Sequence, residues 1–198
     1  MRQEHLRCFR KKFYQALPAI LLLFLEQRPL LASNQAQTWQ KYSMIGQRFE
    51  RAGKRDEAEL WFSKALAVAE KFGEDDPRLS QSLRALADLY MVFGQLKKAE
   101  IHYERELSIL ERMGGNYPDA WHVLAALTKI NYARNNYAAV ERYAERALAL
   151  REKVKVSAKG DELAALDYQL ANAYFKLNKY DRAESLIQES LKLANGKG

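Results

Sequence analysis

Apolar residues recur through most of the chain at the positions i, i+3, i+4 and i+7. Two segments show the pattern most clearly, with apolar or small residues at Leu83, Leu86, Ala87 and Tyr90 and at Ala58, Phe62, Ala65 and Leu66. A period near 3.6 residues places such positions on one face of an α-helix. No stretch of useful length alternates with a period of two, which would indicate a β-strand. The pattern therefore predicts an all-α fold.

The helical pattern repeats along the chain. Equivalent positions stand at Ala58, Ala99, Val140 and Ala183, which are 41, 41 and 43 residues apart. A second similar block precedes each of these positions, so each unit predicts two helices. A single helix pair cannot bury its apolar faces, and neighbouring pairs must therefore stack into a solenoid. We expect four repeats within residues 39–195, at approximately 39–77, 78–117, 118–160 and 161–195.

The turn inside each unit carries glycine or asparagine, at Gly53, Gly94, Asn135 and Asn178. These two residue types tolerate the left-handed backbone that ends many helices, so we expect the same turn in every unit. Between units, Asp76 and Pro77 predict the start of a helix. Asp76 is the expected N-cap, and proline suits the first helical position.

Small and large residues alternate between the two helices of a unit. The small positions are Gly46, Ala87 and Ala171 in the first helices and Ala58, Ala99 and Ala183 in the second. Aromatic side chains are expected to fill the space between them, as helix pairs require at normal packing density. The third unit has Thr128, Asn131 and Val140 where small, aromatic and Ala residues are expected. We expect it to be the least well packed.

The order small, aromatic, Gly, Ala, aromatic, Ala resembles the tetratricopeptide repeat, and the 41–43-residue period resembles its kinesin-light-chain subtype. Segments 64–71, 82–90 and 146–154 carry the resemblance most closely, and it spans about residues 39–195. It implies a right-handed superhelical solenoid of four helix-turn-helix repeats. The function we expect from it is a non-catalytic protein–protein interaction module.

In tetratricopeptide repeat proteins the first helices of successive repeats line a concave groove that holds a peptide or a partner's helix. Carried over by repeat position, the main groove candidates are Arg84, Asp88, His122, Lys129, Tyr132, Tyr168, Asn172 and Phe175. Further candidates are Gln40, Ser43, Gln47, Glu50, Gln81 and Met91. The set mixes aromatic, amide and charged side chains, which suits an amphipathic peptide of a partner protein.

The last predicted helix offers an alternative interaction surface. Ile187, Leu191 and Leu193 lie near its end, without an obvious polar capping helix after them. Solenoids need a polar terminal face, so this end could stack on another copy or on a partner. The alternative function is therefore a structural subunit that self-associates or stacks through its C-terminal helix face.

The sequence holds no motif of catalysis or metal binding. It has no phosphate-binding glycine loop, no H-E-x-x-H and no cysteine cluster. His102 stands apart from other potential ligands, and we expect it to be a surface or packing residue. Glu104, Glu106 and Glu111 lie among arginines at helical spacing, which predicts a solvated, ion-paired face. We therefore expect no enzymatic activity, no cofactor and no metal.

Residues 1–32 differ from the rest of the chain. A basic segment precedes the apolar run 16–25 (ALPAILLLFL), and the small residues Ala32 and Ala36 offer cleavage points. These are the parts of a secretory signal peptide, so we expect a periplasmic or secreted protein. An uncleaved membrane anchor and a helix packed on the domain are the alternatives, and an anchor would be the only contact with a membrane. The single cysteine, Cys8, lies in this segment, which excludes an internal disulfide.

Composition narrows the class of partner. The chain has 198 residues, of which 48% are hydrophobic, with 9 glycines and one cysteine. These values exclude disordered, collagen-like and disulfide-dense classes. The net charge of +7 first suggests nucleic acid. However, residues 1–32 hold six Lys and Arg against two acids, so most of the excess belongs to that segment. We therefore expect no nucleic-acid partner.

Overall fold

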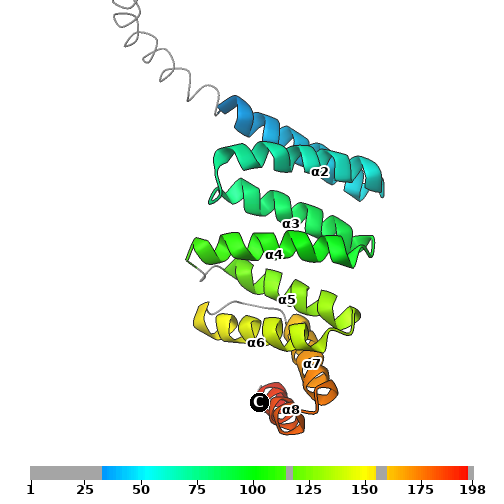
Figure 1. The fold of residues 1–198 in the computed structure, drawn as a ribbon, viewed down its shortest axis with the longest axis vertical. Helices are drawn as coiled ribbons and strands as arrows, with labels where there is room; N and C mark the ends of the chain where they lie inside the picture. The colour runs from blue at the N-terminus through cyan, green and yellow to red at the C-terminus, as the bar shows by residue number, and fades with distance from the viewer. Residues whose placement is uncertain (1–32, 115–117, 155–159, 196–198) are drawn as a thin grey trace, which may run out of the picture.

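The computed structural model describes residues 33–114, 118–154 and 160–195. A first helix at residues 33–51 is followed by α2 (Arg55–Ala69), α3 (Pro77–Val92), α4 (Leu96–Arg112), α5 (Pro118–Ala133), α6 (Tyr137–Val154), α7 (Gly160–Lys176) and α8 (Tyr180–Asn195). A short 3₁₀ turn, Glu70–Phe72, extends α2. Figure 1 shows the helices stacked in chain order along the long axis of the molecule. These ranges contain no strand, so the all-α prediction is confirmed for them.

Helices that follow one another in the chain pack against one another. From α2 onward each α-helix contacts the next, and α5 also contacts α7, which is the first helix of the following pair. One cluster of buried side chains runs from Ala58 of α2 to Ala183 of α8. The core is therefore continuous along the stack, as expected for a solenoid built from pairs that cannot bury their faces alone.

The turns predicted inside the helix pairs are confirmed. Gly53 and Gly94 have φ of 69°, Asn135 has φ of 57° and Asn178 has φ of 59°. After each of these residues, the next backbone N–H donates to the carbonyl five residues earlier. The four bonds, of 2.8–2.9 Å, join Lys54 to Phe49, Gln95 to Tyr90, Asn136 to Asn131 and Lys179 to Tyr174. They satisfy carbonyl groups that the end of a helix otherwise leaves open.

The predicted start of α3 is also confirmed. Asp76 has an extended backbone, and its Oδ1 accepts a 2.9 Å hydrogen bond from the backbone N–H of Arg78. Pro77 occupies the first helical position, where its missing N–H costs nothing. The Arg78 guanidinium also donates to both carboxylate oxygens, and these hydrogen bonds lower the pKa of Asp76.

Small residues lie where paired helices approach most closely. Gly46 is buried, and a Cβ placed on it would lie 2.5 Å from Cδ1 of Phe62 on α2. Ala58, Ala87 and Ala99 are fully buried at the matching positions. The predicted alternation of small and large residues therefore describes the packing of the first two pairs.

The expectation that the third pair packs least well is wrong. Thr128, Asn131 and Val140 are all completely buried. Thr128 Oγ1 donates to the carbonyl of Leu124 at 2.8 Å, and Asn131 Nδ2 donates to that of Leu127 at 3.0 Å. Because both polar side chains find hydrogen-bond acceptors within α5, their burial is tolerated.

Buried tyrosines connect different helices through hydrogen bonds to carboxylates. The hydroxyl donors and their acceptors are Tyr90 with Glu59, Tyr103 with Asp88, Tyr143 with Glu104 and Tyr174 with Glu145. Burial raises the pKa of Tyr90 to about 12, and the hydrogen bond to Glu59 adds to the shift. The pKa of Tyr103, Tyr143 and Tyr174 is raised for the same reasons. These tyrosines remain protonated donors at neutral pH.

Candidate functional site

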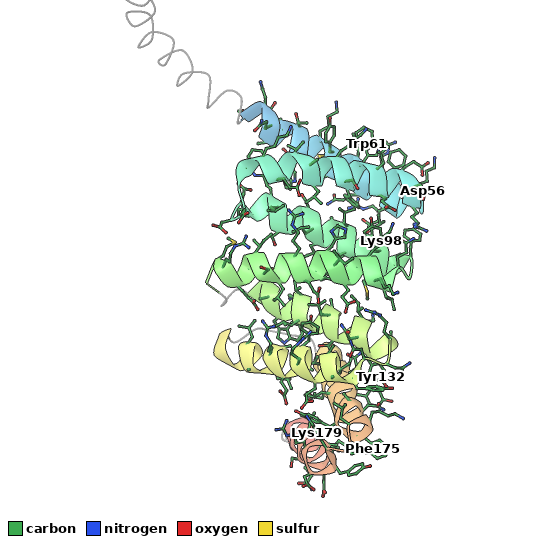
Figure 2. The ribbon with its side chains drawn as sticks, viewed as in Figure 1. Asp56, Trp61, Lys98, Tyr132, Phe175 and Lys179 are labelled. Atoms are coloured by element: carbon green, nitrogen blue, oxygen red, sulfur yellow. The ribbon has the colours of Figure 1, made fainter. Side chains whose placement is uncertain are left out.

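The predicted groove residues lie on the first helices of the pairs, and several of them lie close together. The rings of Tyr132 on α5 and Tyr168 on α7 are 6.3 Å apart between centroids. The indole N–H of Trp39 on the first helix donates to Ser82 Oγ of α3 at 2.8 Å, so these two helices lie side by side. Figure 2 shows Tyr132 and Phe175 on the same side of the stack. The first helices therefore share one face, which we call the first-helix face.

Arg84 is held by acidic side chains on that face. Its guanidinium donates to Oε1 of Glu106 at 2.6 and 2.8 Å and to Oδ1 of Asp119 at 3.0 Å. The arginine thus links α3 to α4 and α5. Its contact with a partner stays a prediction, but three of its polar contacts are internal. Asp88 is similarly engaged, as the acceptor of the Tyr103 hydroxyl.

The expectation that Glu106 lies on a solvated face is wrong. Its side chain is completely buried, and Oε1 accepts from Ser80 Oγ at 3.1 Å as well as from Arg84. Burial raises the pKa of Glu106, while Arg84 and Ser80 lower it in part. Glu104 and Glu111 instead bond across pairs, to Tyr143 and Arg146. The positions equivalent to Glu106 in the other repeats hold the small residues Ala65, Ala147 and Ser190, and the two alanines are buried. These small equivalents are the sequence signal for the burial of Glu106.

A pocket of about 290 Å³ lies between α5 and α7 on the first-helix face. His122, Lys129 and Gln169 contribute its polar lining, and Ala125, Ala126, Leu166 and Trp121 contribute apolar surface. The ring of His122 packs edge-on against Trp121, with centroids 4.9 Å apart. Trp121 is almost completely buried, and its Nε1 has no hydrogen-bond partner among the described residues. The pocket thus combines a cation, an amide and an imidazole with apolar surface.

A larger cleft of about 520 Å³ opens between α7 and α8. Its lining includes the predicted groove residues Tyr168, Asn172 and Phe175, together with Ile187 and Leu191 of the predicted stacking surface. Ala171 and Ala183 are buried in its floor. We call this site the terminal cleft. The sequence predicts these two sets as separate surfaces, whereas the structure joins them in one cleft. Leu193 has a side chain outside the described residues.

His102 is a packing residue, as predicted. Its ring stacks on Tyr90 with centroids 5.5 Å apart and planes 17° from parallel. Burial lowers its pKa, and the positive charge of Arg105 lowers it further. Within residues 33–114, 118–154 and 160–195, no group of three or more His, Cys, Asp or Glu side chains is arranged to hold a metal ion.

The predicted signal segment, residues 1–32, lies outside the described residues. In the part of the chain that the structure covers, every helix is too short or too polar to span a membrane.

Comparisons with known proteins agree with the helical stack. Family models described as tetratricopeptide repeat match residues 40–112 and 168–195, which together are just over half of the chain. No curated protein matches the sequence.

Three solved structures illustrate the shared fold. BtubC (BKLC) from P. vanneervenii is 20% identical, with a TM-score of 0.67 over 79% of this chain and 63% of that one. A putative kinesin light chain from Podosopora anserina with nearly identical TPR-like repeats is 17% identical, with a TM-score of 0.64 over 80% and 76%. The apo form of RapI is 12% identical, with a TM-score of 0.70 over 83% and 44%. At these identities the likeness concerns the fold, and this chain spans less than two thirds of BtubC and RapI.

Proposed function

The chain belongs to the tetratricopeptide repeat family, and on this premise we propose that it is a non-catalytic interaction module that binds a peptide segment of a partner protein on its first-helix face. The pocket between α5 and α7 is the observation that carries the proposal. Two of the residues that sequence reasoning selected for the groove, His122 and Lys129, line it together with Gln169. Both His122 and Lys129 are exposed.

The chemistry of this pocket favours a peptide with one polar acceptor and a neighbouring apolar side chain. Lys129 and Gln169 supply hydrogen-bond donors, and His122 supplies a third donor or an acceptor. Ala125 and Ala126 leave room for an apolar group against the helix surface. The nearby Tyr132 and Tyr168 rings offer flat apolar surface with a hydroxyl, which suits peptide recognition.

Site-specific photocrosslinking in the native host tests this function. A p-benzoylphenylalanine residue at Gln169, in the pocket, should crosslink a partner protein, and Lys129→Glu in the same chain should abolish that crosslink. The matched controls are the photocrosslinker at Lys97 and the Lys97→Glu substitution, since Lys97 is an exposed lysine of α4. Equal crosslinking from Gln169 and Lys97, or insensitivity to Lys129→Glu, would refute binding at the first-helix face.

We further propose that the module acts outside the cytoplasm, exported by the signal-like residues 1–32. The basic start, the apolar run 16–25 and Ala32 support this proposal. Mass spectrometry of the protein recovered from its native host should find an N-terminus near Ser33. A soluble cytoplasmic protein that retains Met1 would refute export without affecting the binding proposal.

A further inference from the structure

The terminal cleft exposes apolar positions that the chain buries elsewhere. When the repeats are aligned on Ala183 and Ala99, Ile187 and Leu191 of α8 stand at the positions equivalent to Tyr103 and Leu107 of α4. Tyr103 and Leu107 are each 5% exposed, whereas Ile187 is 49% exposed and Leu191 is 56% exposed. The difference is that α5 packs against α4, while the described residues contain no helix beyond α8.

The first helices of the third and fourth pairs, α5 and α7, share a buried apolar face. Its positions are Val123, Leu127 and Ile130 in α5 and Leu166, Leu170 and Ala173 in α7, all at most 2% exposed. Their spacing of i, i+4 and i+7 defines one stripe of an amphipathic helix. The first helices α5 and α7 therefore bury the same apolar stripe, and each contacts the preceding pair. At the same register α3 has Leu86 and Leu89, with Ser82 in place of Val123.

The first described helix does not carry that stripe. At the register of Val123 and Ile130 it has Lys41 and Arg48, and both are exposed. A second copy stacked head-to-tail would place these two cations in the terminal cleft, whose lining is mostly apolar and has a single carboxylate, that of Asp167. Two cations cannot both be neutralised by one carboxylate, and burial of an excess charge carries a large free-energy penalty, so this mode of self-association is disfavoured.

We propose that the terminal cleft binds an amphipathic helix of a partner protein, which lies where the first helix of a further pair would lie. The helix carries apolar side chains at i, i+4 and i+7, as Val123, Leu127 and Ile130 do in α5. The site continues the interface that already joins successive pairs within the chain. The small floor residues Ala171 and Ala183 permit the close approach of a helix, and Tyr168 and Phe175 form one wall. This surface is distinct from the α5–α7 pocket, so the inference goes beyond the proposed function.

The test places p-benzoylphenylalanine at Ile187 of the full chain in its native host, with the same residue at Ile101 as the control. Ile101 is a matched isoleucine of α4 and is 63% exposed. We expect a crosslink from Ile187 alone, to a partner segment with apolar residues at i, i+4 and i+7. A synthetic peptide of that segment should bind the purified chain, gain helicity on binding, and bind Leu191→Glu at least about tenfold more weakly, as for an apolar anchor residue.

Two further variants separate this site from the rest of the molecule. Lys129→Glu should leave the affinity for the peptide unchanged, and so should Ile101→Glu. Thermal unfolding followed by circular dichroism confirms that Leu191→Glu retains the fold, as its exposed position predicts. The proposal is overturned by a crosslink from Ile187 to another copy of this chain, by the absence of a crosslink specific to Ile187, or by binding that Leu191→Glu does not weaken. Loss of binding in Lys129→Glu would also overturn it and would assign the peptide to the first-helix face.

Discussion

The buried pair of Arg84 and Glu106 predicts an asymmetry between its two single substitutions. Arg84→Leu leaves a completely buried carboxylate whose one remaining hydrogen-bond donor among the described residues is the Ser80 hydroxyl, at 3.1 Å. Glu106→Ala leaves an arginine whose side chain is 31% exposed and which still has Asp119 as a partner at 3.0 Å. Removing one partner of a buried ion pair leaves the other charge unpaired, which typically lowers the free energy of unfolding by about 3–5 kcal/mol. We expect about 3–4 kcal/mol for Arg84→Leu and about 1–2 kcal/mol for Glu106→Ala.

The double variant measures how much of this cost comes from the unpaired charge that each single substitution leaves behind. Arg84→Leu with Glu106→Ala removes both charges and places Ala at the register of Ala65 and Ala147, which are buried in their own pairs. Its free energy of unfolding should fall by no more than about 1–2 kcal/mol, so the coupling between the two sites is about 3 kcal/mol. Urea denaturation followed by circular dichroism gives all four values. The exposed pair of Lys179 and Glu141 is the control, and Lys179→Ala should cost under about 1 kcal/mol.

The stability of Arg84→Leu, which leaves the Glu106 carboxylate unpaired, should also depend on pH in a predictable direction. Burial raises the pKa of Glu106 even with Arg84 present, and removal of the arginine takes away the largest cause that lowers it. A carboxyl whose pKa is higher in the folded state than in the unfolded state favours folding most at low pH, and the advantage is lost as the pH rises through the folded pKa. The deficit of Arg84→Leu should therefore shrink on acidification below neutral pH. Equal costs for the two single variants, additivity in the double variant, or a deficit that grows on acidification would refute the reasoning.

Three further predictions concern the packing, the turns and the tyrosines. Gly46→Ala should lower the free energy of unfolding by about 1–3 kcal/mol, because the new Cβ meets the Phe62 ring at 2.5 Å, and Phe62→Leu should relieve part of that cost in urea denaturation. Asn178→Ala should cost about 1–2 kcal/mol, because φ is 59° at this residue, whereas Asn178→Gly should stay near wild type; equal melting of the two variants would contradict the left-handed turn. The hydrogen bond of Tyr90 to Glu59 should stabilise the fold fully below about pH 10 and lose its effect as the pH approaches the pKa of about 12, so the difference between wild type and Tyr90→Phe should vanish over that range; a constant difference would contradict the shift.

Local chemistry explains why the helices and their turns are predictable from sequence. The period of the apolar positions determines which face of each helix is buried, and a left-handed residue ends the first helix of each pair. Gly53 and Asn178 differ in residue type but share this backbone conformation, with φ of 69° and 59°. Both features depend on residues within a few positions of one another, so they require no knowledge of the tertiary structure.

The two wrong predictions have a common physical cause. The residue types of Thr128, Asn131 and Glu106 predict poor packing or a solvated acid, but all three side chains are completely buried. Burial follows from the position on the helix face, and a polar side chain is tolerated there when it finds a partner. Thr128 and Asn131 find carbonyls of their own helix, whereas Glu106 finds Arg84 on the paired helix. Partners distant in sequence are not visible in the local pattern, although the alanines at the register of Glu106 do indicate its burial.

The merging of two predicted surfaces changes which substitutions can separate the binding sites. By the sequence prediction, Tyr168→Ala with Phe175→Ala tests the groove, but both side chains also form the wall of the terminal cleft. That double variant would weaken binding at either site. Lys129 lines the α5–α7 pocket but not the terminal cleft, and Leu191 lines the terminal cleft but not the pocket. Reciprocal loss in Lys129→Glu and Leu191→Glu therefore assigns a partner to one surface, because the first helix of the last pair belongs to both.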